Sequence, residues 1–397
     1  MNARFRASLA ALCLLGWGCG KPPPPYDALP FAAAGPDSAP DPAQPGPYPV
    51  GVRTLRIEDG GRRKPDGSPR VLVTEVWYPA LQSSRGGAGE SYDIRTLLTD
   101  EQRAKVAAVD VPLLTTSAVR DAPPASFHGP FPLVVFSHGQ AAVRWQSTYL
   151  TVLLASHGYV VASPDHEGNT LADALRDQLS GTTEAFDARA LDVSYLVNRL
   201  SRLPEADPLH GLAETASFGV AGHSFGAFTS LRVAALDKRV AAIVPQAPTS
   251  TDLAWLGLPA PVKLTIPVLV QAAHRDRTLG WDDNVAPTWA ALERPRYLLD
   301  VVDGGHFTFS DLCGVDLPTL AAKIQLDLPG IDVQKVLEDG CGPPAPPAAV
   351  AQPLIDHFAV GFFNATLRGS AGSRALLSQQ AADGFGAGVA VFTDDGG

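Results

Sequence analysis

Residues 217–236 read SFGVAGHSFGAFTSLRVAAL, and this stretch decides the fold. Its first six residues form a short apolar run typical of a strand, and its last twelve have the apolar spacing of a helix. Between them lies GHSFG at 222–226, a G-x-S-x-G pattern whose glycines allow a strand to turn sharply into a helix. Such a turn projects the hydroxyl of Ser224 beside the positive end of the helix dipole. The context therefore predicts that Ser224 is a nucleophile.

Strand-like runs alternate with helical segments on both sides of this turn. We expect strands at 50–57, 71–78, 132–137, 159–164, 217–222, 240–246, 267–273 and 296–302, and helices at 146–157, 185–202, 225–236, 284–293 and 354–367. This alternation indicates an α/β fold, with a mostly parallel central sheet and helices on both faces. Residues 80–128 and 308–350 interrupt the alternation. We expect both to be lid-like insertions near the site, because loops at the carboxyl ends of strands form the ligand crevice.

A serine hydroxyl needs a base that removes its proton, and a histidine must supply it from elsewhere in the fold. With the chain order serine, acid, histidine, the choice after Ser224 falls to His274, His306 and His357. His306 follows the last expected strand on a glycine-rich turn, DGGH at 303–306, which can carry the imidazole back over the serine. We therefore expect His306 to be the base.

The acid that orients this base should follow the strand at 267–273, and Asp276 stands in that place. Its carboxylate would fix the tautomer of the imidazole and stabilise the imidazolium ion. Asp282, Asp283 and Asp303 lie close by and remain alternatives.

Acyl transfer also needs two main-chain donors for the oxyanion of the tetrahedral intermediate. We expect one to be the amide of Phe225, directly after the nucleophile. The other should be the amide of Gln140 in FSHGQ at 136–140, where Gly139 allows the chain to turn. His138 in this turn is interpreted as a structural hydrogen-bonding residue. The proposed chemistry needs no cofactor, and no metal site is expected, because DHE at 165–167 has no further ligands at suitable spacing.

The N-terminal residues have the layout of a bacterial export signal, with two arginines, an apolar stretch and a small residue before Cys19. We read 1–19 as a signal of the lipoprotein type that would be lipidated at Cys19, with simple cleavage or retention as alternatives. Residues 20–49 are rich in proline, which predicts a disordered tether. A catalytic domain at 50–370 and a tail at 371–397 would follow.

Four cysteines occur in the chain, and Cys313 and Cys341 are the two that lie outside the signal. In the oxidising compartment of an exported protein these two should form a disulfide, with two buried free thiols as the alternative. The compartment would be the bacterial cell envelope, or the periplasm or medium if Cys19 carries no lipid.

Charge and composition limit the partners. The formal net charge is −10, from 41 acidic and 31 basic residues, and no basic run follows the first residues. Because a nucleic-acid surface needs clustered lysine and arginine, we expect no nucleic-acid partner. A membrane would be reached only through the N-terminal lipid. The expected partner is a small-molecule or lipid-like ester.

Four segments occur in the order of a known family: FSHGQ at 136–140, SPDHEGNT at 163–170, GHSFGA at 222–227 and GGHFTFSDLC at 304–313. The chain thus resembles the dienelactone-hydrolase-like and platelet-activating factor acetylhydrolase-like bacterial esterases of the α/β-hydrolase superfamily. The resemblance implies an α/β-hydrolase fold and a serine-dependent carboxylic-ester hydrolase.

The chain also departs from that family. Dienelactone hydrolases proper use a cysteine nucleophile, where this chain has Ser224. Animal acetylhydrolases place the acid one strand earlier, where VPQAP at 244–248 offers no carboxylate, and Asp276 instead matches the layout of polyester and cutinase-like hydrolases. A polyester or phospholipid acetyl-ester hydrolase therefore remains an alternative. So does a catalytically silent binding protein on the same scaffold, because fold alone does not determine activity.

Overall fold

The structure is a computed structural model that describes residues 40–64, 66–106, 113–250, 264–314 and 333–396. The expected signal at 1–19, with its lipidation residue Cys19, lies outside the described residues, and so does the tether up to residue 39.

The last ten residues of the expected tether are described, and they pack against the domain. Tyr48 is 2% exposed, and its ring packs edge-on against the ring of Phe131 at 5.4 Å between centroids. Its main-chain amide donates to the carbonyl of Ser156. Burial of this aromatic ring gives the segment the apolar area that the proline-rich residues lack. The folded domain therefore includes residues before Val50.

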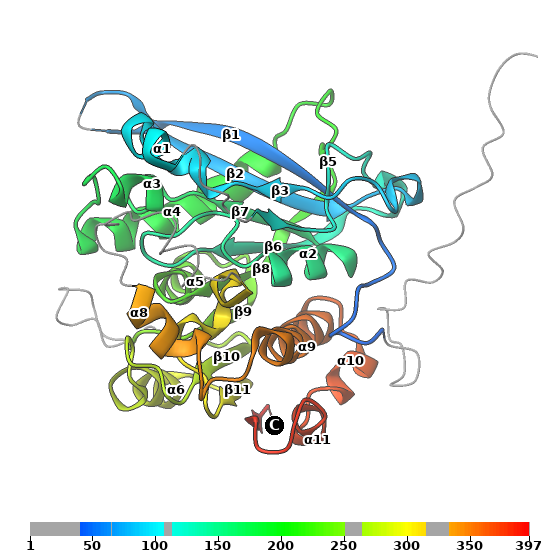
Figure 1. The fold of residues 1–397 in the computed structure, drawn as a ribbon. Coiled ribbons are helices and arrows are strands. Elements are labelled where there is room, and N and C mark those ends of the chain that lie inside the picture. The colour runs from blue at the N-terminus through cyan, green and yellow to red at the C-terminus, as the bar shows by residue number, and fades with distance from the viewer. Residues whose placement is uncertain (1–39, 65, 107–112, 251–263, 315–332, 397) are drawn as a thin grey trace, which may run out of the picture.

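One large sheet forms the centre of the molecule (Figure 1). Ten strands of the described residues follow the order β12-β11-β10-β9-β8-β6-β7-β2-β1-β5. Their bounds are β1 Val50–Arg63, β2 Pro69–Pro79, β5 Val119–Arg120, β6 Phe131–Ser137, β7 Val160–Pro164, β8 Ala213–His223, β9 Val240–Gln246, β10 Val268–Ala273, β11 Arg296–Val301 and β12 Ala390–Asp395. The adjacent strands β11, β10, β9, β8, β6 and β7 run parallel. β2 pairs antiparallel with both β7 and β1, and β12 pairs antiparallel with β11.

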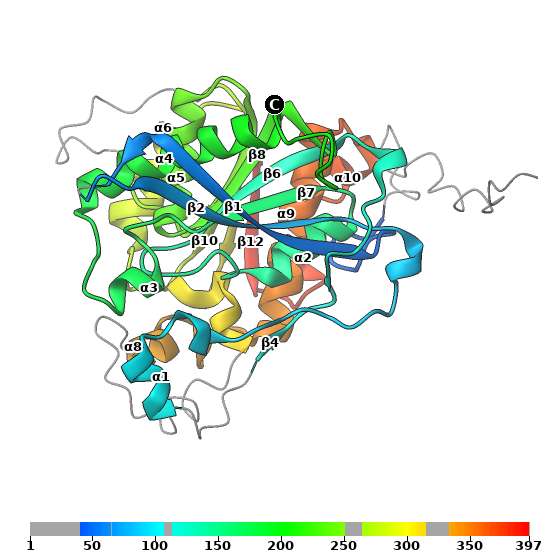
Figure 2. The ribbon, with the colours of Figure 1, turned by 90° about the horizontal axis from the view of Figure 1, so that it is seen from above.

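Helices cover both faces of this sheet (Figure 2). The described helices are α1 Asp100–Val106, α2 Thr148–Ser156, α3 Leu171–Ala174, α4 Thr182–Leu200, α5 Phe225–Leu236, α6 Ala286–Ala291, α8 Val333–Val336, α9 Ala348–Leu367, α10 Ala371–Ala375 and α11 Gln379–Asp383. Alternate residues of β6 belong to two hydrophobic cores. Val134 packs in the core that holds α2 and α9, whereas Leu133 packs in the core that holds α4 and α5. The expected α/β class is confirmed.

The C-terminal segment differs from the expected tail. Its last strand, β12, pairs antiparallel along the whole of β11 and forms one edge of the sheet. Ala390 and Phe392 are buried, while Val391 between them is half exposed. This alternation is that of an edge strand with one face on the core. The expectation of a tail at 371–397 is therefore wrong for this strand, because β12 is part of the central sheet.

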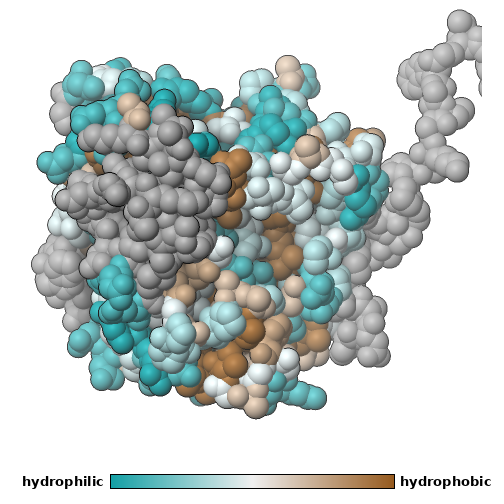
Figure 3. Space-filling model, viewed as in Figure 1, coloured by the Kyte–Doolittle hydropathy of each residue, from teal (hydrophilic) through white to brown (hydrophobic). Residues whose placement is uncertain are grey.

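Polar residues cover much of the face seen in Figure 3, and hydrophobic residues gather near its centre and lower half. The large hydrophobic side chains exposed in the described residues are scattered along the chain: Leu113, Phe127, Leu179, Leu191, Leu236 and Val391. None of the helices in the described part of the chain has the length and hydropathy needed to cross a membrane.

Candidate active site

The turn between β8 and α5 holds Ser224 in an unusual backbone conformation. Its φ is +56° and its ψ is −116°, a combination that a residue with a side chain rarely adopts. The flanking glycines are required because the backbone segments touch. A Cβ at Gly222 would lie 2.4 Å from the carbonyl oxygen of Gly226, and one at Gly226 would lie 1.8 Å from that of Ser137. The turn therefore depends on both glycines.

Three side chains meet at the carboxyl ends of the parallel strands. The Oγ atom of Ser224 lies 2.9 Å from Nε2 of His306, and Nδ1 of His306 lies 2.8 Å from Oδ2 of Asp276. Asp276 follows β10, and His306 begins the 3-10 turn His306–Phe309 after β11. His306 is 3% exposed and Asp276 is 6% exposed. The contacts form one continuous array of serine, imidazole and carboxylate.

The second oxygen of Asp276 is held by the main chain. Oδ1 accepts hydrogen bonds from the amides of Thr278 at 2.8 Å and Leu279 at 2.6 Å. These bonds fix the carboxylate plane and leave Oδ2 for the imidazole.

The alternative acids and bases lie elsewhere. Asp282 and Asp283 are exposed, and Asp303 forms an ion pair with Arg275 at 2.8 Å. Nδ1 of His274 contacts Asp300 at 3.0 Å, and Nε2 of His357 contacts the carbonyl of Leu376 at 3.0 Å. None of these side chains reaches the array of Ser224, His306 and Asp276.

The turn after β6 offers a main-chain donor at Gln140. The amide before it, of Gly139, donates to Oε1 of Gln146 at 2.7 Å, and the amide after it, of Ala141, donates to the carbonyl of Asn169 at 3.2 Å. Within the described residues the amide of Gln140 has no such acceptor. Phe225 is the first residue of α5, where helical amides lack partners within the helix. Both expected donor amides are therefore available.

Comparisons with known proteins agree with this geometry. The model of the PET hydrolase-like family matches residues 123–319, which include all three residues of the array. The model of platelet-activating factor acetylhydrolase, isoform II, matches residues 42–195. A ferulic acid esterase from Streptomyces cinnamoneus has a similar structure, with a TM-score of 0.62 and 29% sequence identity over 81% of this chain and 91% of that chain. The chain is an esterase of the α/β-hydrolase fold. No curated protein matches it.

The late insertion of the esterase contributes a carboxylate that the sequence analysis missed. Asp339 is 1% exposed, and its Oδ1 accepts from the amides of His306 at 3.0 Å and Arg277 at 2.9 Å. Its Oδ2 accepts from the hydroxyl of Thr278 at 2.7 Å. Asp339 thus joins the turn that carries His306 to the turn that carries Asp276.

The expected disulfide closes this insertion of the esterase. Cys313 and Cys341 are bonded across a separation of 28 residues. The Sγ atom of Cys313 lies 3.2 Å from the carbonyl oxygen of Phe307 and 3.3 Å from that of Gly340. The bond therefore holds the chain next to Asp339 against the turn of His306.

A second side chain missed at the sequence level is Gln146. Its Nε2 donates to Nδ1 of His223 at 2.7 Å, and Nε2 of His223 then donates to the carbonyl of His306 at 2.8 Å. Burial is the main cause that lowers the pKa of His223 to about 3, and the neighbouring imidazole of His306 adds to the shift. His223 is therefore neutral, and Gln146 links the turns of Gly139, Ser224 and His306 in the esterase. No local motif marks this glutamine, because its partners come from other strands.

The described residues of the esterase contain no group of three or more histidines, cysteines, aspartates or glutamates arranged to hold a metal. In the segment DHE at 165–167, Asp165 pairs with Arg144, and Glu167 pairs with Lys64. The polar side chains of this segment are thus engaged in ion pairs and hydrogen bonds.

Proposed function

We propose that the esterase cleaves a carboxylic ester through an acyl-enzyme, with Ser224 as nucleophile, His306 as base and Asp276 as the residue that orients the base. The observation that carries this proposal is the array of Ser224, His306 and Asp276, with contacts of 2.9 and 2.8 Å. Such contacts are those of a serine whose proton passes to an imidazole. Among the described residues, no other serine combines a positive φ, partial exposure of the residue and a side-chain contact with a histidine.

The chemistry follows from these contacts. Ser224 attacks the ester carbonyl while Nε2 of His306 takes its proton, and the imidazolium then protonates the leaving alcohol. Water, activated by the same imidazole, releases the acid and restores the serine. The negative charge that develops on the carbonyl oxygen is held by the amides of Phe225 and Gln140. The chain's own residues supply each of these steps.

The position of the acid supports a polyester-hydrolase type of site over a phospholipid acetylhydrolase type. The PET hydrolase-like match includes Ser224, Asp276 and His306, whereas the acetylhydrolase match ends at residue 195, before all three. β9, one strand before the acid, ends at Gln246 without a carboxylate. We propose a substrate with a short or medium acyl group, and a polyester segment as the second candidate.

Two measurements on the purified protein test this proposal. A fluorophosphonate probe should label Ser224 and no residue in the Ser224→Ala variant, because the probe needs an activated serine. A panel of p-nitrophenyl acetate, butyrate and octanoate with methyl ferulate and a soluble terephthalate ester should then show the preferred acyl group. A folded wild-type protein that neither reacts with the probe nor hydrolyses any of these esters would contradict the proposal.

We also propose that the esterase is exported to the bacterial cell envelope and lipidated at Cys19. The disulfide between Cys313 and Cys341 supports an oxidising compartment, and the residues before Cys19 support a lipoprotein signal. Expression with labelled palmitate should give a labelled membrane-bound protein. The Cys19→Ser variant should carry no label, and a label retained in that variant would contradict the assignment.

A further inference from the structure

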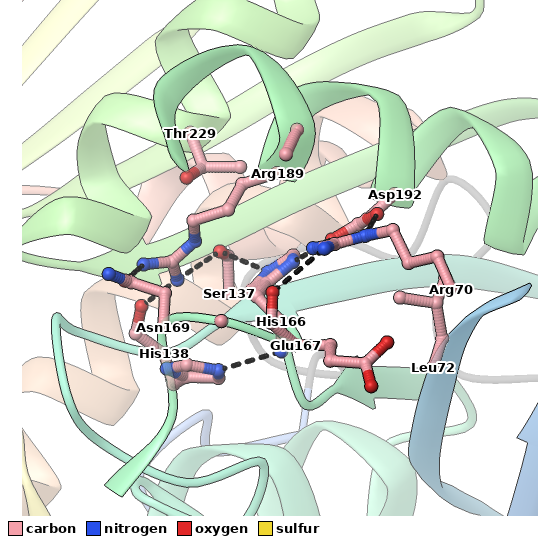
Figure 4. A network of polar contacts seen from close by, with 12 residues as sticks. Arg70, Leu72, Ser137, His138, His166, Glu167, Asn169, Arg189, Asp192 and Thr229 are labelled. Atoms are coloured by element: carbon pink, nitrogen blue, oxygen red, sulfur yellow. Dashed lines mark hydrogen bonds and ion pairs between the residues drawn. The ribbon is translucent and has the colours of Figure 1, made fainter. Parts of the chain in front are cut away.

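The turn that carries Gln140 is held from the inside of the protein by a buried polar network (Figure 4). Five of its members, from the end of β6 and the turn after it, from the segment after β7 and from α4, are 0% exposed: Ser137, His138, His166, Arg189 and Asp192. None can touch a substrate, so the network acts on the site only through the residues that it positions.

The hydrogen bonds of His138 fix its tautomer. Nε2 lies 3.1 Å from the main-chain amide of His166, and Nδ1 lies 2.7 Å from the carbonyl oxygen of Gly139. An amide nitrogen can only donate and a carbonyl can only accept, so Nε2 is the acceptor and Nδ1 carries the proton. The Nδ1–H group of His138 therefore holds the carbonyl of the next residue.

This hydrogen bond determines the orientation of one peptide group. In a trans peptide the C=O and N–H groups point in opposite directions. Because the Gly139 carbonyl points back to buried His138, the amide of Gln140 in the same peptide points away from it. A flip of this peptide would replace that amide with a carbonyl oxygen, which would repel an oxyanion.

His166 is fixed in turn by Ser137 and Asp192. Its Nδ1 donates to Oδ2 of Asp192 at 2.8 Å, and its Nε2 accepts from the hydroxyl of Ser137 at 2.9 Å. Arg70 holds the same carboxylate with two bonds of 2.7 Å. This order of serine, imidazole and carboxylate repeats that of the proposed catalytic array. Full burial excludes a second catalytic centre, so the arrangement serves to hold the backbone of His166.

Arg189 reaches both sides of the turn. Its guanidinium group donates to Ser137 Oγ at 3.0 Å, to the carbonyl of His138, and to Oδ1 of Asn169 at 2.9 Å. It also lies 4.7 Å from the centre of the ring of Phe225, the residue that holds the other expected donor amide. Burial, together with the charge of Arg189, lowers the pKa of His138 far below its usual value. A neutral imidazole keeps Nε2 free to accept.

We propose that His138 is a positioning residue of the oxyanion hole, which holds the Gly139–Gln140 peptide with its amide toward the substrate, while His166 and Arg189 hold His138. This inference rests on the proposed function, because it needs Gln140 to donate to the oxyanion. In this role His138 neither takes nor returns a proton during ester cleavage.

Two substitutions separate the donor at Nδ1 from the bulk of the side chain. His138→Gln keeps an acceptor near the His166 amide but has no group at the place of Nδ1. Its kcat on p-nitrophenyl butyrate should fall about 100- to 1000-fold, the effect of losing an oxyanion donor, with KM changed by less than about threefold. His138→Asn places an amide NH2 near the position of Nδ1, and its kcat should stay within about tenfold of the wild type. The acid limb of the pH profile should be unchanged in both variants.

His157→Gln is the matched control for buried histidines. His157 is 0% exposed, and its Nε2 contacts the carbonyl of Gln44 at 2.8 Å, away from the site. This variant should lose stability and keep its kcat.

Equal losses of kcat in the His138→Gln and His138→Asn variants would overturn the inference. A 100-fold loss of kcat in folded His138→Asn alone would do so as well. Wild-type kcat in His138→Gln beside an inactive Ser224→Ala would also overturn it, whereas an active Ser224→Ala would overturn the proposed function itself.

Discussion

The carboxylate of Asp339 accepts a hydrogen bond from the main-chain amide of His306 at 3.0 Å. The same oxygen accepts from the amide of Arg277, which follows Asp276 directly. A side chain of the late insertion therefore links the turn of His306 to the turn of Asp276. Its position is held by the disulfide at Cys341, two residues later.

Removal of the Asp339 carboxylate should weaken both activity and stability. Asp339→Ala leaves the buried amide of His306 without its acceptor, and the part-buried amide of Arg277 and hydroxyl of Thr278 lose theirs as well. A buried unsatisfied group costs about 1–3 kcal/mol. We expect kcat/KM to fall at least about tenfold and the free energy of unfolding to fall by about 3 kcal/mol. Asp339→Asn keeps one acceptor oxygen and should lose less. Ester hydrolysis and urea unfolding measure both effects.

Glu338→Gln is the control for this experiment. Glu338 lies next to Asp339, and its side chain is 52% exposed in a 3.6 Å ion pair with Arg277. Exposed pairs contribute about 1 kcal/mol or less, so the control should match the wild type closely. Wild-type kcat/KM in Asp339→Ala would show that the insertion does not position the base.

Loss of the disulfide should affect the site as well as the fold. For a separation of 28 residues the chain-entropy model gives about 3.5 kcal/mol of stabilisation. The double variant Cys313→Ala, Cys341→Ala should lose roughly that amount in urea unfolding. Its kcat should also fall, because the segment of Asp339 is no longer held against the turn of His306. Lower stability with an unchanged kcat would show that the disulfide stabilises the fold without positioning the residues of the site.

Low pH should reduce the free energy of unfolding, because His157 is buried as the neutral imidazole. Burial lowers the pKa of His157 to about 4, whereas the unfolded chain takes up this proton near pH 6.5. Between these values the unfolded state binds more protons, so the stability present above pH 6.5 is lost as pH falls toward 4. From pH 7 to pH 5 the stability advantage of the wild type over His157→Gln should shrink by about 2 kcal/mol. A difference that stays constant across this range would contradict a neutral buried His157.

The sequence predicts the elements of the site whose signal is local. Ser224 lies in a motif that a strand must precede and a helix must follow, and the structure shows both. Chain order and strand ends then limit the choice of base and acid, and the structure brings His306 and Asp276 into contact with each other and with the serine. The fold class follows from the same alternation of strands and helices.

Residues that act through distant partners leave no such signal. Arg189 and Asp192 occupy α4, where charged residues at helical spacing ordinarily face solvent, yet both are fully buried against β6 and the segment after β7. Asp339 belongs to a stretch without periodicity, and its partners lie 33 and 62 residues away. Only the tertiary structure identifies these residues as supports of the site.

Turnover of p-nitrophenyl butyrate by purified Ser224→Ala tests the central claim most directly. Ser230→Ala is the control, because Ser230 is a buried serine on α5 whose hydroxyl donates a hydrogen bond to the carbonyl of Ala227 within the same helix. We predict that kcat falls by about 10⁴-fold or more in Ser224→Ala and stays within about threefold of the wild type in Ser230→Ala. Wild-type turnover by a folded Ser224→Ala protein would contradict the account.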